Sequence, residues 1–135
     1  MRRNNGTLNA QLSRVISELG HTDKVVVTDA GLPIPAAVER VDLAVRANLP
    51  RFLDLLDTVL SEISIEAALL SEEIREHSPT MQAEIEQRLA AFGVVAQYIP
   101  HTEFKATTHD ARAAVRSGEF TPYANVLLTA GVVYG

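Results

Sequence analysis

The 135-residue sequence contains no cysteine and no tryptophan. Without cysteine it can form neither disulfides nor thiolate metal sites, which agrees with a reducing compartment. Its apolar runs stay well below the roughly 20 residues that a membrane-spanning helix needs. The first residues, MRRNNGTLNAQL, carry two arginines with no apolar stretch behind them, so we expect no signal peptide. These absences predict a soluble protein of the cytoplasm.

Positive charge is also scarce, because 12 lysines and arginines stand against 17 aspartates and glutamates, for a net charge of −5. The basic residues are scattered along the chain, which argues against a nucleic-acid partner. No two of the four histidines are spaced as ligands on one element, and the acidic residues show no ligand spacing either. We therefore expect no bound metal.

Two common catalytic loops are missing as well. The stretch DAGLPIP carries one glycine and two prolines, which is unlike a glycine-rich phosphate loop. The stretches SGE and TAG are too short for a nucleophile elbow. The chemistry that remains is proton transfer by histidine, whose ordinary pKa lies near neutrality, with carboxylate, amide and phenol groups beside it.

Apolar residues make up 47% of the chain, which suits one domain over residues 1–135. Capping signals make Asn9 the expected start of the first helix and Gly20 its left-handed C-terminal residue. Apolar periodicity predicts helices at 8–19, 50–60, 79–92 and 108–116, and strands at 24–28, 41–45, 64–74, 94–100 and 123–134. This alternation indicates an α/β fold, a three-layer α/β/α domain with a mostly parallel, mixed central sheet. In such sheets ligands bind beyond the carboxyl ends of the strands.

The expected strand at 24–28 is bracketed by two residues that can take part in chemistry, His21 and Asp29. At about 3.3 Å per residue, the two ends of this strand lie on the order of 17 Å apart. The two side chains meet only if the preceding link folds His21 back, or if another element or another chain completes the pocket. This distance favours a site shared between subunits. On composition alone, however, His21 is a loop histidine in solvent and Asp29 a residue that begins a turn.

His101 follows the strand at 94–100 and so lies at a carboxyl end, although a polar residue at a helix entry explains it equally well. Tyr123 and Asn125 flank Ala124 where the last strand begins, and strand alternation places their two side chains on one face. A phenol beside a carboxamide suits a polyhydroxylated ligand, but the pair serves equally well to close a sheet edge. The remaining histidines are interpreted as surface residues beside helix caps: His77 and His109.

Four stretches resemble the D-ribose pyranase/fucose mutarotase family: LGHTDKVVVTDAGLPIP, IEAALLSEEI, FKATT and SGEFTPYANVLLTAGVVY. Together they span nearly the whole chain, and the first and last are specific. The triplets His21-Thr22-Asp23 and Ala30-Gly31-Leu32 are similar to the ribose pyranase branch rather than to the fucose mutarotases. The resemblance implies an isomerase that interconverts the β-pyranose and β-furanose forms of D-ribose without a cofactor. It also implies a ring-shaped homo-oligomer, a homodecamer, whose pockets are shared between neighbouring subunits.

Carried over residue by residue, the resemblance makes His21 the proton donor. It makes Asp29 and His101 sugar contacts, and it adds the segment Tyr123, Ala124 and Asn125 to the sugar site. Two alternatives stay open: a mutarotase of another reducing sugar such as L-fucose, and a sugar-binding ring without catalytic activity. The presence of His21 favours catalysis, because a binding module has no need of an acid there.

Overall fold

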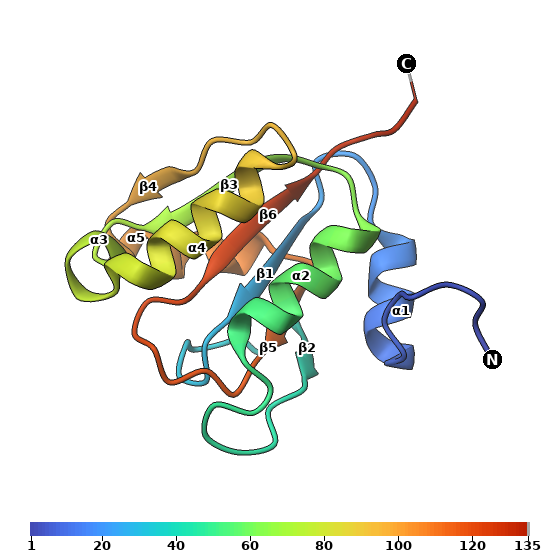
Figure 1. The fold of residues 1–135 in the computed structure, drawn as a ribbon, viewed down its shortest axis with the longest axis horizontal. Helices are drawn as coiled ribbons and strands as arrows, with labels where there is room; N and C mark the ends of the chain where they lie inside the picture. The colour runs from blue at the N-terminus through green and yellow to red at the C-terminus, as the bar shows by residue number, and fades with distance from the viewer. Residues whose placement is uncertain (135) are drawn as a thin grey trace.

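The centre of the molecule is a mixed β-sheet, seen in a computed structural model that describes residues 1–134 (Figure 1). Its strands within that range are β1 (Lys24–Thr28), β2 (Glu39–Asp42), β3 (Ile65–Ser71), β4 (Gln97–Ile99), β5 (Ala113–Arg116) and β6 (Val126–Ala130). They lie in the order β2-β5-β1-β6-β3-β4. β6 runs antiparallel to β1 and β3, whereas the other neighbouring strands run parallel. The sheet is therefore mostly parallel and mixed, as predicted.

Helices cover both faces of the sheet, which confirms the three-layer α/β/α arrangement (Figure 1). The helical segments described are α1 (Ala10–Glu18), α2 (Phe52–Glu62), α3 (Ile74–His77), α4 (Pro79–Ala90), α5 (His101–Thr107) and the 3-10 turn η1 (Thr108–Asp110). α1, α2 and α4 pack on one face through Leu12, Leu56 and Leu89. α5 lies on the other face, where Phe104 packs with the loop that follows β1. Across residues 1–134, none of these helices combines the length and the apolar character that crossing a bilayer requires.

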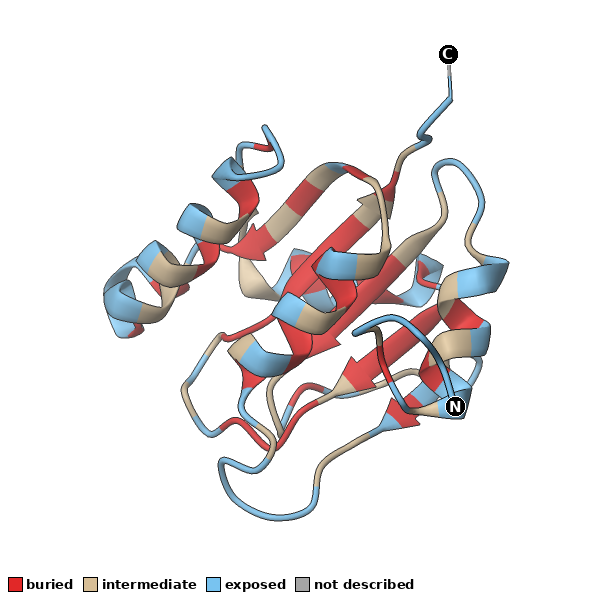
Figure 2. Ribbon diagram, turned by 45° about the vertical axis from the view of Figure 1, so that its right-hand side comes forward, coloured by how far each residue is buried: buried red, intermediate tan, exposed pale blue. Residues whose placement is uncertain are grey.

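The central strands are apolar on both sides because both of their faces are covered. In β1, Val25 and Val27 pack in the core cluster that includes α1 and α2, whereas Val26 packs with α5. All three valines are buried, and Figure 2 shows burial continuing along the neighbouring strands. The three consecutive valines thus hold β1 firmly in the core up to the point where Asp29 follows it.

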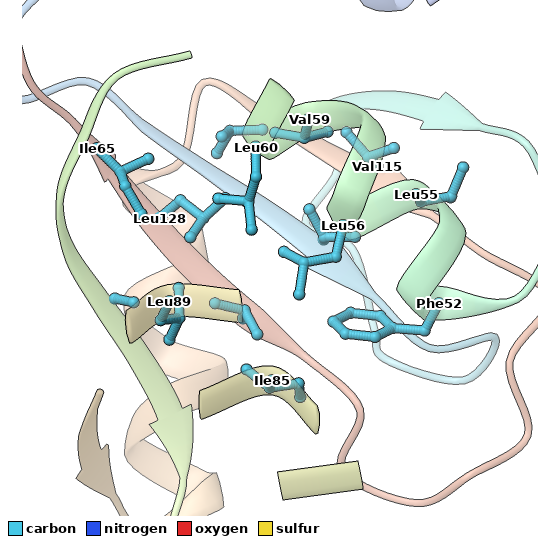
Figure 3. Packing of buried hydrophobic residues seen from close by; sticks show 14 of the residues in the cluster. Phe52, Leu55, Leu56, Val59, Leu60, Ile65, Ile85, Leu89, Val115 and Leu128 are labelled. Atoms are coloured by element: carbon cyan, nitrogen blue, oxygen red, sulfur yellow. The ribbon is translucent and has the colours of Figure 1, made fainter. Parts of the chain in front are cut away.

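α2 supplies much of the packing on its face of the sheet (Figure 3). Phe52, Leu56 and Val59 recur at helical spacing, and all three are fully buried. Ile85 and Leu89 of α4 belong to the same core cluster. Burial of each large apolar side chain stabilises the fold by about 1.5–3 kcal/mol. This packing fixes the sheet whose edge carries the candidate site.

Several helix ends follow the capping signals in the sequence. Asn9 Oδ1 accepts the Leu12 N–H at 2.8 Å, which confirms it as the N-cap of α1. Gly93 has a φ of +71° just beyond α4, as expected of a residue that stops a helix. α2 begins later than predicted, at Phe52, whose N–H donates to the buried Glu119 carboxylate at 3.0 Å.

The link from α1 into β1 differs from the prediction. α1 ends in an extended residue, and the left-handed φ, 72°, belongs to Thr22 rather than to Gly20. The Asp23 carboxylate accepts the Gly20 N–H at 2.8 Å, and the Thr22 N–H donates to the last residue of β6 at 2.9 Å. A β-branched residue with positive φ is unusual, so these hydrogen bonds are what hold the turn that presents His21.

The predicted helix at 108–116 is wrong, because only the 3-10 turn η1 is helical there and the last four residues of the segment form β5, between β1 and β2. Ala114 and Val115 are buried, and coverage of both sheet faces outweighs the helix propensity of the alanines around them. The predicted strand at 41–45 is also too long at its C-terminal end. The chain leaves the sheet after Asp42, and Val45 is exposed.

Candidate active site

Five of the six residues singled out in the sequence meet at one edge of the sheet. β6 begins where its antiparallel neighbours β1 and β3 end, and this places Asn125 beside Asp29. His101 enters the same edge after β4, as the first residue of α5. Tyr123 and Ala124 precede Asn125 in the turn that leads into β6. This edge is the carboxyl end of the parallel strands, where ligands bind in α/β folds.

Asp29 is held by hydrogen bonds on both carboxylate oxygens. Its Oδ1 accepts the N–H groups of Gly31 at 3.0 Å and Leu32 at 2.8 Å, and its Oδ2 accepts Asn125 Nδ2 at 3.2 Å. The fully buried Asn125 also accepts the Asp29 N–H at 2.9 Å. Burial raises the pKa of Asp29, and the hydrogen bonds to its carboxylate oppose that rise. Asp29 therefore begins a turn, as composition alone predicted, and its carboxylate can still accept a further hydroxyl.

His101 lies half-buried between polar and aromatic neighbours. Its Nδ1 lies 2.6 Å from the Ser71 hydroxyl at the end of β3, and its backbone N–H donates to the Glu73 carboxylate at 3.0 Å. Its ring stacks on Phe104 with centroids 6.2 Å apart. Burial lowers the pKa of His101, and so does the charge of Lys105. The neutral ring, with one donor and one acceptor, is therefore favoured at neutral pH.

The Tyr123 ring closes another side of this cluster. It meets the His101 ring edge-on at a centroid distance of 4.9 Å, and the exposed His77 lies against it at 5.3 Å. Tyr123 and Asn125 do not alternate along a strand as predicted, because β6 begins after them and Tyr123 has a φ of 63°. The Asn125 N–H donates to the Tyr123 carbonyl at 2.9 Å, which closes a tight turn. The Ala124 side chain within that turn packs in the core.

The residues that support this cluster, Ser71 and Glu73, were not predicted from the sequence. Ser71 ends β3 and Glu73 follows soon after, within a stretch interpreted only as a strand. The available signal was a polar residue at the carboxyl end of a strand, the same signal that singled out Asp29. His77 is exposed, as predicted, but no pattern in the sequence indicates its contact with Tyr123.

His21 lies at the opposite end of β1 from Asp29. The link before β1 does not fold back, because His21 Nε2 lies 3.0 Å from Glu66 Oε2 on β3 and the His21 side chain is 51% exposed. His21 borders a pocket of about 300 Å³ that is also lined by Leu19 and Val132. Within one chain, His21 and Asp29 cannot contact the same small ligand. The expectation that the link folds His21 back toward Asp29 is therefore wrong. Completion of the pocket by another element or another chain stays a prediction.

A hollow of about 410 Å³ adjoins Asp29, with Arg116 and Phe120 in its wall. The Phe120 N–H donates to Asn48 Oδ1 at 3.0 Å, in the loop that also contains Val45 and Leu49. Phe120, Val45 and Leu49 are 64%, 73% and 44% exposed, and Phe120 shares the wall of the hollow with Asp29. The Asp29 cluster therefore lies at an open and partly apolar surface.

The chemistry of the cluster is that of hydrogen bonding and proton transfer. No group of three or more histidine, aspartate or glutamate side chains in residues 1–134 is arranged to hold a metal ion. The cluster offers an imidazole, a carboxylate, a carboxamide and a phenol, which together can bind several hydroxyl groups. Such an arrangement suits a small polyhydroxylated molecule.

The stability of the protein should depend on pH through His101. The pKa of His101 is lower in the folded protein than its ordinary value of 6.5. As the pH falls below about 6.5, the unfolded chain therefore binds a proton at His101 more readily than the folded protein does. Stability supplied by neutral His101 is therefore present above about pH 6.5 and lost as the pH falls through the lowered pKa. We expect the Tm of the wild type to fall more steeply than that of His101→Gln between about pH 7 and pH 5 in circular-dichroism melts. The exposed His109→Gln serves as a control that should keep the wild-type slope, and parallel slopes for wild type and His101→Gln would contradict the prediction.

Comparison with known proteins assigns the chain to a family. Residues 2–133 match the model of the RbsD/FucU transport protein family. The chain belongs to this family. A similar RbsD/FucU relative is a D-ribose pyranase from Laribacter hongkongensis, 48% identical over 98% of this chain and 99% of the relative. A D-ribose pyranase from Geobacillus kaustophilus is 44% identical over 98% of this chain and 96% of the relative. The matches confirm the family resemblance found in the sequence.

Two solved structures share the fold of this chain. Bacillus subtilis RbsD complexed with D-ribose has a TM-score of 0.93 and 38% identity, over 98% of this chain and 100% of that one. The fucose mutarotase from Streptococcus pneumoniae in complex with L-fucose has a TM-score of 0.83 but only 22% identity, over 99% of this chain and 100% of that one. The second structure therefore supports the fold alone.

Proposed function

We propose that this protein is an isomerase that interconverts the β-pyranose and β-furanose forms of D-ribose by opening and reclosing the sugar ring, without a cofactor. The observation that carries this proposal is the similarity to the Bacillus subtilis structure complexed with D-ribose, at 38% identity over 98% of this chain. The cluster around Asp29 and His101 supports it, since its donors and acceptors suit the hydroxyl groups of a monosaccharide.

Ring opening requires two proton transfers. An acid protonates the ring oxygen as its bond to C1 breaks, and the anomeric hydroxyl loses its proton, which leaves an open-chain aldehyde. A different hydroxyl then attacks C1 and gives up its proton, while the aldehyde oxygen takes one up and becomes the new anomeric hydroxyl. No proton is gained or lost overall. Imidazole suits such reversible transfer at neutral pH, and general acid–base catalysis typically contributes about 10²–10⁴-fold.

In this proposal His21 donates the proton to the ring oxygen. Asp29 accepts hydrogen bonds from sugar hydroxyls, and His101 and Tyr123 contact the sugar beside it. Asn125 is fully buried and already bonded to Asp29 on both sides of its carboxamide, so its main contribution is to hold Asp29 in place. The remaining Nδ2 hydrogen of Asn125 and the backbone of Ala124 complete the contacts.

We also propose that each site is shared between two subunits of a ring-shaped homodecamer in the cytoplasm. His21 and Asp29 lie at opposite ends of β1, so a sugar bound at Asp29 reaches the His21 of a neighbouring copy and not its own. Exposed apolar side chains support such contacts on both halves. Phe120 lies beside Asp29, with Val45 and Leu49 in the loop bonded to it, and the 91% exposed Val133 lines the His21 pocket. The cysteine-free sequence agrees with a reducing compartment.

NMR saturation transfer on equilibrated D-ribose and L-fucose tests the proposed reaction. Catalytic amounts of the protein should transfer saturation between pyranose and furanose signals of ribose, well above the rate in a buffer blank. Exchange between anomers of fucose, without any effect on ribose, would instead support a mutarotase of another sugar. Binding of ribose without exchange would support a sugar-binding ring and overturn the proposal.

A further inference from the structure

The Ser71 hydroxyl lies 2.6 Å from Nδ1 of His101 at the carboxyl end of β3. Building on the proposed function, we propose that Ser71 is a positioning residue for sugar binding. It donates to Nδ1 and so keeps the proton of neutral His101 on Nε2, from which His101 donates a hydrogen bond to a sugar hydroxyl. Ser71 therefore decides whether His101 acts as a donor or as an acceptor in the site.

The direction of the hydrogen bond follows from the burial of Ser71. Ser71 is fully buried, and within residues 1–134 its hydroxyl has a single hydrogen-bond partner, His101. If Nδ1 carried the ring proton, it would donate to Ser71, and the hydrogen of the serine would then be buried without an acceptor. An unsatisfied buried donor is costly, so the favoured arrangement has Ser71 donating to an unprotonated Nδ1.

The rest of His101 is held as firmly as its Nδ1. Both oxygens of the Glu73 carboxylate accept the His101 N–H, at 3.0 and 3.1 Å. Phe104 lies parallel to the ring and Tyr123 meets it edge-on, so rotation of the imidazole would break both contacts. The lowered pKa of His101 agrees with a neutral ring, in which the position of the single proton matters.

This tautomer gives His101 and Asp29 complementary roles. Nε2–H of His101 is a donor, and the ionised Asp29 carboxylate is an acceptor. A sugar hydroxyl accepts and donates at once, so it can bridge the two groups with both of its hydrogen-bonding functions satisfied. A neutral His101 of this kind has no free basic nitrogen, which leaves the proton transfers of the reaction to His21.

The proton position can be measured directly, without a substrate. With only four histidines in the chain, ¹⁵N-histidine solid-state NMR of the sedimented full-length protein at neutral pH can resolve each ring. The His101 signals, assigned by their loss in His101→Gln, should show Nε2 protonated and Nδ1 unprotonated. A ring with its proton on Nδ1, or a charged ring, would overturn the proposal.

Substitution of Ser71 should then change binding more than turnover. We expect Ser71→Ala to give a mixture of His101 tautomers and to weaken ribose binding about tenfold, as a raised KM with little change in kcat. Ser71→Thr, which restores the hydroxyl, should restore the tautomer. Ser117 is the matched control. It is also a fully buried serine, it directly follows β5, and its hydroxyl donates to the Thr28 carbonyl at 2.6 Å.

Different outcomes test the role of Ser71 and the proposed isomerisation of ribose. Ser117→Ala should leave the His101 tautomer unchanged, and a similar loss of tautomer there would show a general loosening and overturn the role of Ser71. An unchanged tautomer or unchanged ribose binding in Ser71→Ala would overturn it as well. If the tautomer is as expected but ribose is not isomerised, the assigned reaction fails while the control of His101 by Ser71 stands.

Discussion

Mixing two inactive variants should restore activity that neither has alone. His21→Ala removes the proposed acid and should lower the exchange rate about 10²–10⁴-fold. Asp29→Asn removes the carboxylate charge at the other half of the site, while asparagine can still begin the turn at this position. In a randomly mixed assembly, about one quarter of the shared sites combine an intact His21 with an intact Asp29, because each comes from a different chain. Co-expressed subunits should therefore regain about one quarter of the wild-type rate.

The physical reason is the position of the two residues at opposite ends of β1, with His21 next to Glu66 on the neighbouring strand. Co-expression with two affinity tags, followed by tandem purification, isolates mixed assemblies for the NMR exchange assay. A mixture of His21→Ala with His21→Gln is the matched control and should stay inactive, since both variants lack the same half. Verified mixed assemblies of His21→Ala with Asp29→Asn that stay inactive would rule out a shared site.

Loss of the Asn125 side chain should damage both stability and activity. Asn125→Ala leaves the Asp29 N–H and one carboxylate oxygen of Asp29 without their partners in a partly buried position. An unsatisfied buried group costs about 1–3 kcal/mol, and water can replace part of the lost bonding at Asp29, so we expect the free energy of unfolding to fall by about 1–3 kcal/mol in total. A carboxylate displaced by even about 1 Å costs on the order of 10²-fold in rate. Denaturant unfolding and the ribose exchange assay measure the two effects.

The same variant should shift the pH dependence of activity. Burial raises the pKa of Asp29, and the Asn125 hydrogen bond works against that rise. Without Asn125 the pKa of Asp29 should increase further, so the ionised acceptor is lost at a higher pH and the acidic limb of the rate profile moves upward. Asn9→Ala is the matched control, because Asn9 also accepts a backbone N–H but caps α1. It should cost about 1 kcal/mol of stability and leave the pH profile in place, whereas a shift of equal size in both variants would contradict the prediction.

Local sequence patterns predicted much of the scaffold. The valines of β1 and the apolar spacing of α2 are strong patterns because burial alone determines them. The segment that became β5 was misread because alanine favours helices in isolation, whereas its position between two strands is a property of the whole sheet. No local pattern shows that a segment will pair in the middle of a sheet.

Residues of the candidate site could be predicted where a polar residue follows a strand. The contacts that join distant segments of the chain could not. Asp29 and His101 follow strands that could be recognised in the sequence. The contact of Ser71 with His101 joins residues 30 positions apart, and Asn125 reaches Asp29 across 96 positions. The first contact depends on β4 pairing with β3, and the second depends on β6 pairing with β1. No local pattern in the sequence indicates either pairing. The family resemblance named Asn125 without showing what it holds.

The central place of β6 has a consequence for biosynthesis. β6 is the last strand in chain order, yet it joins the β2-β5-β1 half of the sheet to the β3-β4 half. A nascent polypeptide that still lacks this segment on the ribosome has two half-sheets with exposed inner edges and no Asn125 to hold Asp29. Translation must therefore pass Ala130 before the sheet can close, and products of premature termination upstream of β6 would be both inactive and prone to aggregate through those edges.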